Sequence, residues 1–156
     1  MKTPILSRTL LAALTLGTAS AVTPVSAPTW SNTGLSSATY VILEPRVEGN
    51  INLVGADQRK SILEAMKRDS AGAISRRYPA AKIATDAATP GAIRVTPTFI
   101  APRSLVPWAK LGGRLDFELP NGQKMSARED FGISILLQKR SEFVNYMYDT
   151  VAKQLP

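Results

Sequence analysis

Hydrophobic and polar residues alternate along residues 93–99, 115–119 and 125–127, and this period of two predicts half-buried antiparallel strands. Between the last two runs lies Pro120-Asn121-Gly122. We expect a three-residue turn with Gly122 in the left-handed conformation, because a two-residue loop would place apolar residues opposite polar ones. This turn sets the register and pairs Phe117 with Met125, Leu115 with Ala127, and Glu118 with Lys124.

Two segments show the spacing of amphipathic helices instead. Residues 57–78 are bounded by Asp57 as a candidate N-cap and by Pro79 as a stop, and residues 141–155 begin at Ser141. At 100° per residue, each segment gathers its apolar side chains on one face. These faces comprise Ile62, Leu63, Met66, Ser70, Ala73 and Ile74 in the first helix, and Phe143, Val144, Met147, Tyr148, Val151 and Leu155 in the second.

The remaining strands are shorter or contain proline. Residues 39–47 are rich in β-forming residues but include Pro45, and residues 81–85 form a short candidate strand. Pro97 predicts that the strand from Ile93 lies at an edge or contains a bulge. Residues 133–137 continue the parity of the hairpin's second arm, so they either extend that strand or form a buried turn before the last helix.

This order of elements predicts an α+β fold. We expect a two-layer sandwich, with a mainly antiparallel sheet of about four to five strands and two helices on one face. Residues 39–156 would form this single α/β domain, since no internal repeat or second domain is evident in the sequence.

The amino terminus has the features of a signal peptide. Lys2 and Arg8 are positively charged, Leu10–Leu16 is a short apolar run, and Ala19-Ser20-Ala21 has the form of a cleavage site. The apolar run is too short to span a membrane. We therefore expect residues 1–21 to be removed, residues 22–38 to be a flexible leader rich in Pro, Ser and Thr, and the protein to be exported to the periplasm or the extracellular medium.

Composition restricts the chemistry further. Removal of residues 1–21 would take two of the nineteen basic residues and no acid, so the net charge would fall from +7 to +5. The chain has no cysteine, which excludes disulfides and lipid attachment to a cysteine, and no histidine. Histidine-based triads, thiol nucleophiles and His/Cys zinc sites are therefore excluded. We expect no cofactor, no metal site and no enzymatic activity.

The remaining catalytic options are carboxylate pairs, Ser-Lys dyads and oxygen-ligand metal sites, and no cluster of Asp, Glu and Asn has calcium-loop spacing. Glu129 and Asp130 are adjacent in a predicted strand, so their side chains point to opposite faces and cannot share a proton. Residues 55–61 end in Lys-Ser at a helix start but place Arg59 where a phosphate loop needs its second glycine, so they cannot form that loop.

Candidate binding residues are basic or aromatic. Trp108 lies in a proline-containing connection between Arg103 and Lys110, where it either recognises a partner or covers the open end of the core. The basic residues of the first helix point in several directions, which favours a solvated helix over a surface for polyanions. The candidate partner-binding residues are Arg103, Trp108, Lys110, Arg76, Arg77, Lys139 and Arg140.

The order of elements, with Ile93-Arg94-Val95-Thr96-Pro97-Thr98-Phe99 and the Pro-Asn-Gly hairpin, resembles small α/β domains of bacterial cell-envelope accessory proteins. These include the curli-secretion-channel type, the TolB amino-terminal type and the auxiliary components of lipid transporters. The resemblance covers residues 39–155 and implies a binding or assembly role in the envelope, with no site residue carried across. Many such proteins are anchored through a lipidated cysteine, which this chain lacks.

We therefore expect an exported, non-enzymatic domain that binds an envelope protein or lipid through a sheet edge or through residues 103–110. One alternative is a binder of anionic polymers, either nucleic acid or acidic polysaccharide, through its basic surface. A second alternative is a hydrolase that uses carboxylates only.

Overall fold

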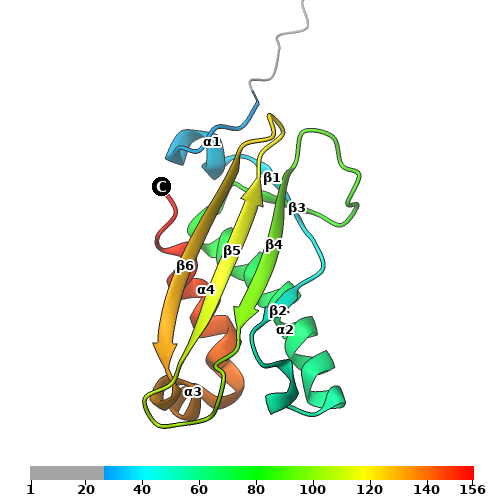
Figure 1. Cartoon of the computed structure of the whole chain (residues 1–156). Helices are drawn as coiled ribbons and strands as arrows, with labels where there is room; N and C mark the ends of the chain where they lie inside the picture. The colour runs from blue at the N-terminus through cyan, green and yellow to red at the C-terminus, as the bar shows by residue number, and fades with distance from the viewer. Residues whose placement is uncertain (1–26) are drawn as a thin grey trace, which may run out of the picture.

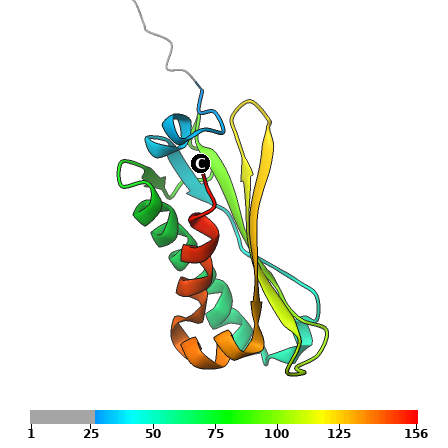
Figure 2. The same ribbon diagram turned by 90° about the vertical axis from the view of Figure 1, so that its left-hand side faces the viewer.

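The computed structural model describes residues 27–156 as a sheet with helices packed on one of its faces (Figure 1 and Figure 2). The strands are β1 (Thr39–Ile42), β2 (Arg46–Glu48), β3 (Lys82–Ala84), β4 (Ile93–Ile100), β5 (Lys110–Glu118) and β6 (Lys124–Gly132). The helices are α1 (Asn32–Ser36), α2 (Ala56–Arg77), α3 (Ile133–Lys139) and α4 (Phe143–Ala152), with 3₁₀ turns η1 (Ile51–Leu53) and η2 (Arg140–Glu142). The predicted two-layer arrangement is confirmed. The predicted signal peptide, residues 1–21, lies outside the described residues.

The sheet is mixed rather than mainly antiparallel. Its order is β3-β1-β4-β5-β6, and β2 pairs with β4 in line with β1, which gives six strands instead of the four to five expected. β1 is parallel to both β3 and β4, whereas β5 is antiparallel to both of its neighbours. The parallel half arises because α2 carries the chain back to the end where β1 began, so that β3 runs in the same direction as β1.

The hairpin of β5 and β6 has the predicted register. Phe117 pairs with Met125, and Glu118 pairs with Lys124. The turn is closed by hydrogen bonds that join the Leu119 amide to the Gln123 carbonyl and the Gly122 amide to the Leu119 carbonyl. Gly122 has a φ of 85°, the left-handed conformation that the turn requires and that glycine adopts without strain.

Pro97 is neither at an edge nor in a bulge, because β4 is a continuous central strand with β5 on one side and β1 and β2 on the other. The Leu43 amide donates to the Val95 carbonyl at 2.8 Å. The next bond of this parallel ladder would come from the amide of residue 97, which proline lacks. The neighbouring line of strands is interrupted at this point, between Ile42 and Arg46, and pairing resumes in β2.

The apolar faces of α2 and α4 were predicted correctly. Met66 and Ile74 of α2 are fully buried, as are Met147 and Val151 of α4. Both caps differ from the prediction: α2 begins at Ala56 after Gly55, α4 begins at Phe143 after Glu142, and neither cap residue offers a side-chain hydrogen bond. The two helices lie side by side over the sheet (Figure 2), and the Arg76 side chain joins them through Asp149 and Asn145.

Residues 133–137 do not extend the sheet. The ladder ends at Gly132 because its partner Lys110 is the first residue of β5, so the chain has no strand left to pair with. Residues Ile133–Lys139 form α3 instead, which leads directly into η2 and α4.

The segment expected to be a flexible leader is partly folded. Within residues 27–38, Asn32–Ser36 form α1 and Leu35 is fully buried. The Tyr40 hydroxyl donates to the Leu35 carbonyl at 2.7 Å, and the Trp30 ring stacks edge-on against Phe117 at 5.2 Å. The folded domain therefore begins before Thr39, the first residue of the predicted domain.

Candidate functional site

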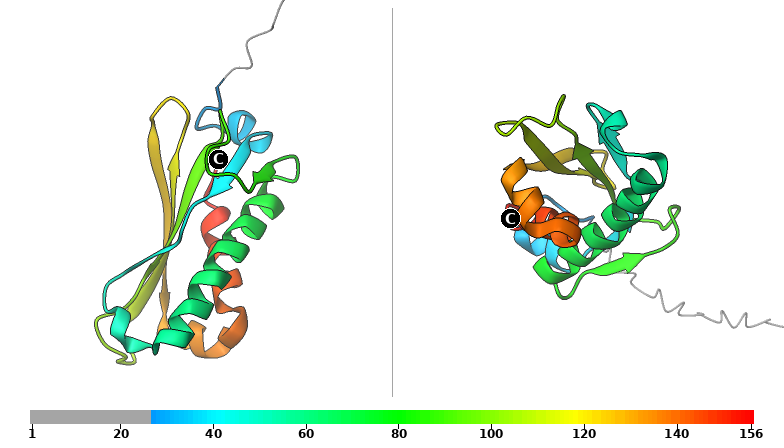
Figure 3. Two further views of the ribbon diagram at one scale, coloured as in Figure 1. Left: turned by 90° about the vertical axis from the view of Figure 1, so that its right-hand side faces the viewer. Right: turned by 90° about the horizontal axis from the view of Figure 1, so that it is seen from below.

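An apolar cavity of about 440 Å³ lies at the end of the molecule where β4 ends and β5 begins. We call this the cavity end; it is at the bottom of Figure 1 and faces the viewer in the right-hand view of Figure 3. Its walls come from β2, η1, the first turns of α2, the β4–β5 connection, α3 and the start of α4. The apolar lining comprises Val47, Ile51, Leu53, Val54, Ile62, Ala65, Phe99, Ala101, Pro102, Leu105, Leu111, Leu136, Phe143 and Val144.

The polar lining of the cavity is basic or neutral. Arg59 and Arg140 contribute the charges, and Asn50, Gln58, Ser61 and Ser141 contribute neutral groups. No aspartate or glutamate lines the cavity. The charged groups that line this apolar cavity are therefore all positive.

Arg59 lies on the first turn of α2 and is held against η1. Its Nη2 donates to the Ile51 carbonyl at 3.0 Å, while its Nε is buried and has no hydrogen-bond partner among residues 27–156. A buried guanidinium donor without a partner is unfavourable, because it loses water without regaining a hydrogen bond. The Arg59 side chain thus retains hydrogen-bonding capacity beside the cavity.

Arg140 occupies the junction between α3 and α4. Among residues 27–156 it is the only non-glycine residue with a positive φ, at φ 47° and ψ −118°. A side chain with a Cβ is strained in this region of backbone space, and such strain is concentrated at functional positions. The Arg140 side chain is part of the cavity wall.

Four large apolar side chains are exposed at the cavity end, and two of them, Leu105 and Ile51, line the cavity itself. Trp108 is 79% exposed, Leu137 69%, Leu105 62% and Ile51 38%. These residues come from the β4–β5 connection, α3 and η1, which all meet at the cavity end (Figure 1). Because the Asn50 side chain donates to the Arg103 carbonyl at 3.2 Å, η1 and the connection are held together.

Five of the seven predicted partner-binding residues lie at this end. Arg103, Trp108 and Lys110 lie in or beside the β4–β5 connection, whereas Lys139 and Arg140 lie at the end of α3, and all five are exposed. None of the four basic residues forms an ion pair with another described residue; Lys139 lies over the Tyr146 ring at 4.6 Å. The exposure of Trp108 contradicts the interpretation in which it covers the core.

The other two predicted residues have partners within the molecule. Arg76 bonds Asp149 and Asn145 of α4, and Arg77 donates to the carbonyls of Leu155 and Pro156. Elsewhere on α2, Lys67 pairs with Glu44 and Arg68 with Asp69. These contacts occupy most of the charges that a polyanion would need on this helix.

The carboxylates of the sheet are also occupied. Arg114 bonds both Glu48 and Asp116, and Asp116 accepts further hydrogen bonds from Thr98 and Ser126. The hydrogen bond from Arg114 lowers the pKa of Glu48 below its ordinary value. This network lies on the face of the sheet opposite the helices, and it attaches β2 to β5.

The adjacent acids of β6 point in opposite directions, as predicted. Glu129 accepts a hydrogen bond from Gln154 near the end of α4, whereas Asp130 pairs with Arg128 of its own strand. The described residues contain no cluster of three or more potential metal ligands. Within the same residues, no helix has the length and apolar character that a membrane span requires.

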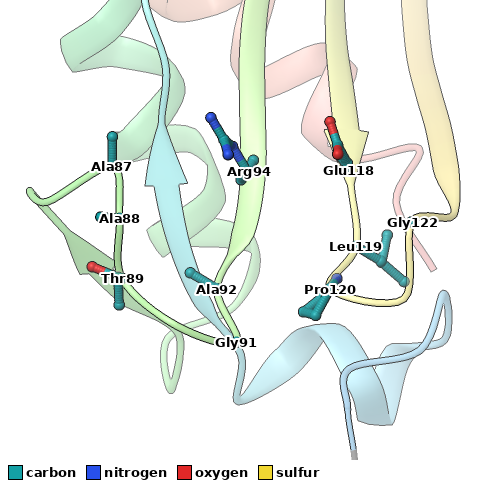
Figure 4. A pocket seen from close by; sticks show the side chains of 10 residues that line it. All are labelled: Ala87, Ala88, Thr89, Gly91, Ala92, Arg94, Glu118, Leu119, Pro120 and Gly122. Atoms are coloured by element: carbon teal, nitrogen blue, oxygen red, sulfur yellow. The ribbon is translucent and has the colours of Figure 1, made fainter.

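A second cavity, of about 330 Å³, lies at the opposite end, beside the tip of the β5–β6 hairpin (Figure 4). Its lining is made largely of small residues from the β3–β4 loop. Arg94 and Glu118, which are register partners on β4 and β5, provide one charge of each sign. This cavity therefore lacks both the apolar wall and the single sign of charge found at the cavity end.

Sequence reasoning missed the cavity itself and with it Arg59, Leu105 and Leu137 as site residues. The cavity combines residues separated by up to about a hundred positions, such as Val47 and Val144, so no local pattern encodes it. One signal was available in the sequence. If residues 133–139 are placed on a helix instead of a strand, Leu137 has no buried position. Leu105 lies in a connection where no packing partner was predicted.

Comparisons with known proteins do not assign a family. No family model matches the chain, and no curated protein matches it. Among solved structures, it is similar to the PelC dodecamer from Paraburkholderia phytofirmans, with 13% identity, 78% of this chain and 89% of that chain covered, and a TM-score of 0.43. A minor lipoprotein from Acinetobacter baumannii has 10% identity and a TM-score of 0.35, with 76% of this chain and 88% of that one covered.

An uncharacterized protein of known structure has 10% identity and a TM-score of 0.43, and the match covers 76% of this chain and 94% of that one. At these values the likeness concerns the arrangement of helices and strands. It carries no argument about function, which therefore has to be argued from the site.

Proposed function

We propose that this protein is an exported, non-enzymatic accessory domain of the cell envelope that binds a partner through its cavity end. One observation carries the proposal: an apolar cavity, exposed apolar side chains and unpaired basic residues occur together at the same end of the molecule. Exposed apolar side chains of this size are unfavourable in water, and a cluster of them marks a binding surface. The signal-peptide pattern of residues 1–21 supports export.

The chemistry of this end favours a lipid surface with anionic headgroups over a protein. Tryptophan is enriched at membrane interfaces because its apolar ring and its polar N–H suit the two sides of the boundary. Trp108 stands between Arg103 and Lys110 in sequence, and each basic residue near an anionic surface contributes about 1 kcal/mol of attraction. The protein would lie on the membrane surface without crossing it.

Co-sedimentation with lipid vesicles tests the proposal. The purified protein is expected to bind phosphatidylcholine vesicles that contain phosphatidylglycerol, and to bind pure phosphatidylcholine vesicles much less. The double variant Lys110→Gln/Lys139→Gln should weaken binding by about tenfold or more, since two attractive charges are lost.

The matched control is Lys82→Gln/Lys124→Gln, which removes two exposed lysines from β3 and from the start of β6, away from the cavity end. It should bind vesicles nearly as well as the unmodified protein. Equal losses in both double variants would mean that net charge alone drives binding, which favours the anionic-polymer alternative. No binding to any vesicle would contradict binding to a lipid surface.

A further inference from the structure

We propose that the cavity holds one acyl chain of an amphipathic anion, with the anionic head paired to Arg59 and Arg140. This inference rests on the proposed function, since it specifies what the cavity end recognises. A flat lipid surface would require only the exposed residues around the rim. The cavity adds an apolar space that a single acyl chain can enter from that lipid surface.

The size and lining of the cavity fit an alkyl chain. Its volume of about 440 Å³ lies in the range of about 300–1,000 Å³ that is common for small-molecule sites. The walls are aliphatic or aromatic on all the contributing elements, among them Ile62 of α2, Leu111 of β5 and Val144 of α4. An alkyl chain offers no polar group that such walls would leave without a partner.

The charges at the cavity fit an anionic head. Arg59 and Arg140 approach from different elements, and the exposed acids closest to them in sequence, Asp57 and Glu142, are not part of the lining. A guanidinium group can bind a carboxylate or a phosphate through two parallel hydrogen bonds. The Arg140 side chain forms no ion pair with another described residue, whereas Arg59 already donates from Nη2 to the Ile51 carbonyl.

The backbone at Arg140 supports the same assignment. A glycine would adopt its φ of 47° without strain, yet the chain has an arginine there. An arginine that only filled space at this junction would introduce backbone strain that no other interaction offsets. Binding of an anion by its side chain accounts for the charge at this strained position.

Titration of the purified protein with sodium laurate below its micellar concentration tests the inference by calorimetry. Laurate should bind with one site per chain. Decanoate, which is two methylenes shorter, should bind roughly fifteenfold more weakly, because each buried methylene contributes about a fourfold factor. Dodecyl maltoside, which has the same alkyl chain on an uncharged head, should bind at least tenfold more weakly than laurate.

Three variants locate the site. Arg140→Gly should lower laurate affinity about tenfold while thermal stability stays the same or rises, because glycine relieves the positive φ. Ala65→Phe fills the cavity and should abolish binding. Arg94→Gln removes an exposed arginine that lines the second cavity and should change nothing.

Unchanged laurate affinity in Arg140→Gly, or equal binding of laurate and dodecyl maltoside, would overturn the inference even if Ala65→Phe failed to fold. Vesicle binding separates this result from the proposed function. A protein that binds anionic vesicles but not laurate retains the surface function without the acyl site. A protein that binds laurate but no vesicle has a soluble amphiphile as its ligand, and the proposed binding to a lipid surface fails.

Discussion

The two tryptophans of the protein lie at opposite ends and in opposite environments. Trp30 stacks on Phe117 beside the hairpin, where α1 closes over the core. Trp108 lies in the β4–β5 connection with 79% of its surface exposed. The same residue type therefore stabilises the fold at one end and remains available for contact at the other.

The surroundings of the two rings show the same contrast. Near Trp30, the buried side chains Leu35 and Leu119 contribute to the core. At the end that holds Trp108, Leu105 and Ile51 are exposed and line the cavity. The hairpin end thus uses its apolar residues for folding, whereas the cavity end leaves several of them exposed. Three experiments on the tryptophans test this difference, and a fourth concerns the attachment of β2.

The largest effect is expected from Trp30→Ala. Truncation removes the edge-on contact with Phe117 and opens a void over the core, which should lower the free energy of unfolding by about 2–3 kcal/mol. Trp108→Ala should change the same quantity by less than about 0.5 kcal/mol, because an exposed side chain loses little on truncation. Urea denaturation of both variants provides the measurement, and comparable losses would remove the distinction between the ends.

For binding to anionic vesicles, replacing Trp108 should have a larger effect than replacing Trp30. Trp108→Ala is expected to weaken binding to anionic vesicles by about five- to tenfold, which corresponds to about 1–1.4 kcal/mol of lost interfacial contact. Trp30→Phe keeps an aromatic ring in the packed site and should bind as the unmodified protein does. Co-sedimentation compares the two, and unchanged binding of Trp108→Ala would remove this residue from the docking surface.

A smaller effect concerns the attachment of β2, whose Val47 lines the cavity. Arg114→Gln should raise the pKa of Glu48 toward its ordinary value of about 4.3, because the hydrogen bond that favours the carboxylate is lost. A carboxyl with a lowered folded pKa stabilises the fold above its unfolded pKa, and this contribution disappears as the pH falls through the folded pKa. The pair should therefore contribute at most about 1 kcal/mol near pH 7 and nothing in strong acid.

Carboxyl NMR titration of Glu48 measures this shift directly. The control is Arg94→Gln. Arg94 lies on the same face of the sheet as Arg114 but does not contact Glu48, so its replacement should leave the Glu48 pKa unchanged. A Glu48 pKa that is the same with and without Arg114 would contradict the assigned cause.

The smallest effect is spectroscopic. In the single-tryptophan variants Trp30→Phe and Trp108→Phe, acrylamide should quench the remaining Trp108 much more strongly than the remaining Trp30. The difference should fall when anionic vesicles are added, since docking would cover Trp108. Equal quenching with and without vesicles would place Trp108 outside the contact.

Local patterns predicted the parts of the fold that local chemistry decides. The β5–β6 register followed from alternation and from the conformational demand on Gly122, and the buried faces of α2 and α4 followed from helical spacing. Both are properties of contiguous sequence.

Where tertiary partners decide, the sequence was insufficient. Pro97 suggested an edge or a bulge, but the interruption that accommodates it lies in the neighbouring line of strands, between Ile42 and Arg46. Trp30 lies in the segment predicted to be a flexible leader, yet its ring packs against Phe117. The predicted site residues at the cavity end were found from charge and aromatic character. The cavity between them was not, because it depends on how α2 and α4 meet the sheet.

The interruption between β1 and β2 has a consequence for motion. With no ladder bond from residue 97, the short strand β2 and the following turn η1 are joined to the rest of their strand line only through residues 43–45. Segments with so few buried backbone bonds open at low free energy, so hydrogen exchange should be faster in β2 and η1 than in β1. The bonds from Asn50 to the Arg103 carbonyl and from Arg59 to the Ile51 carbonyl tie this segment to the β4–β5 connection and to α2, so these contacts set how readily this wall of the cavity opens.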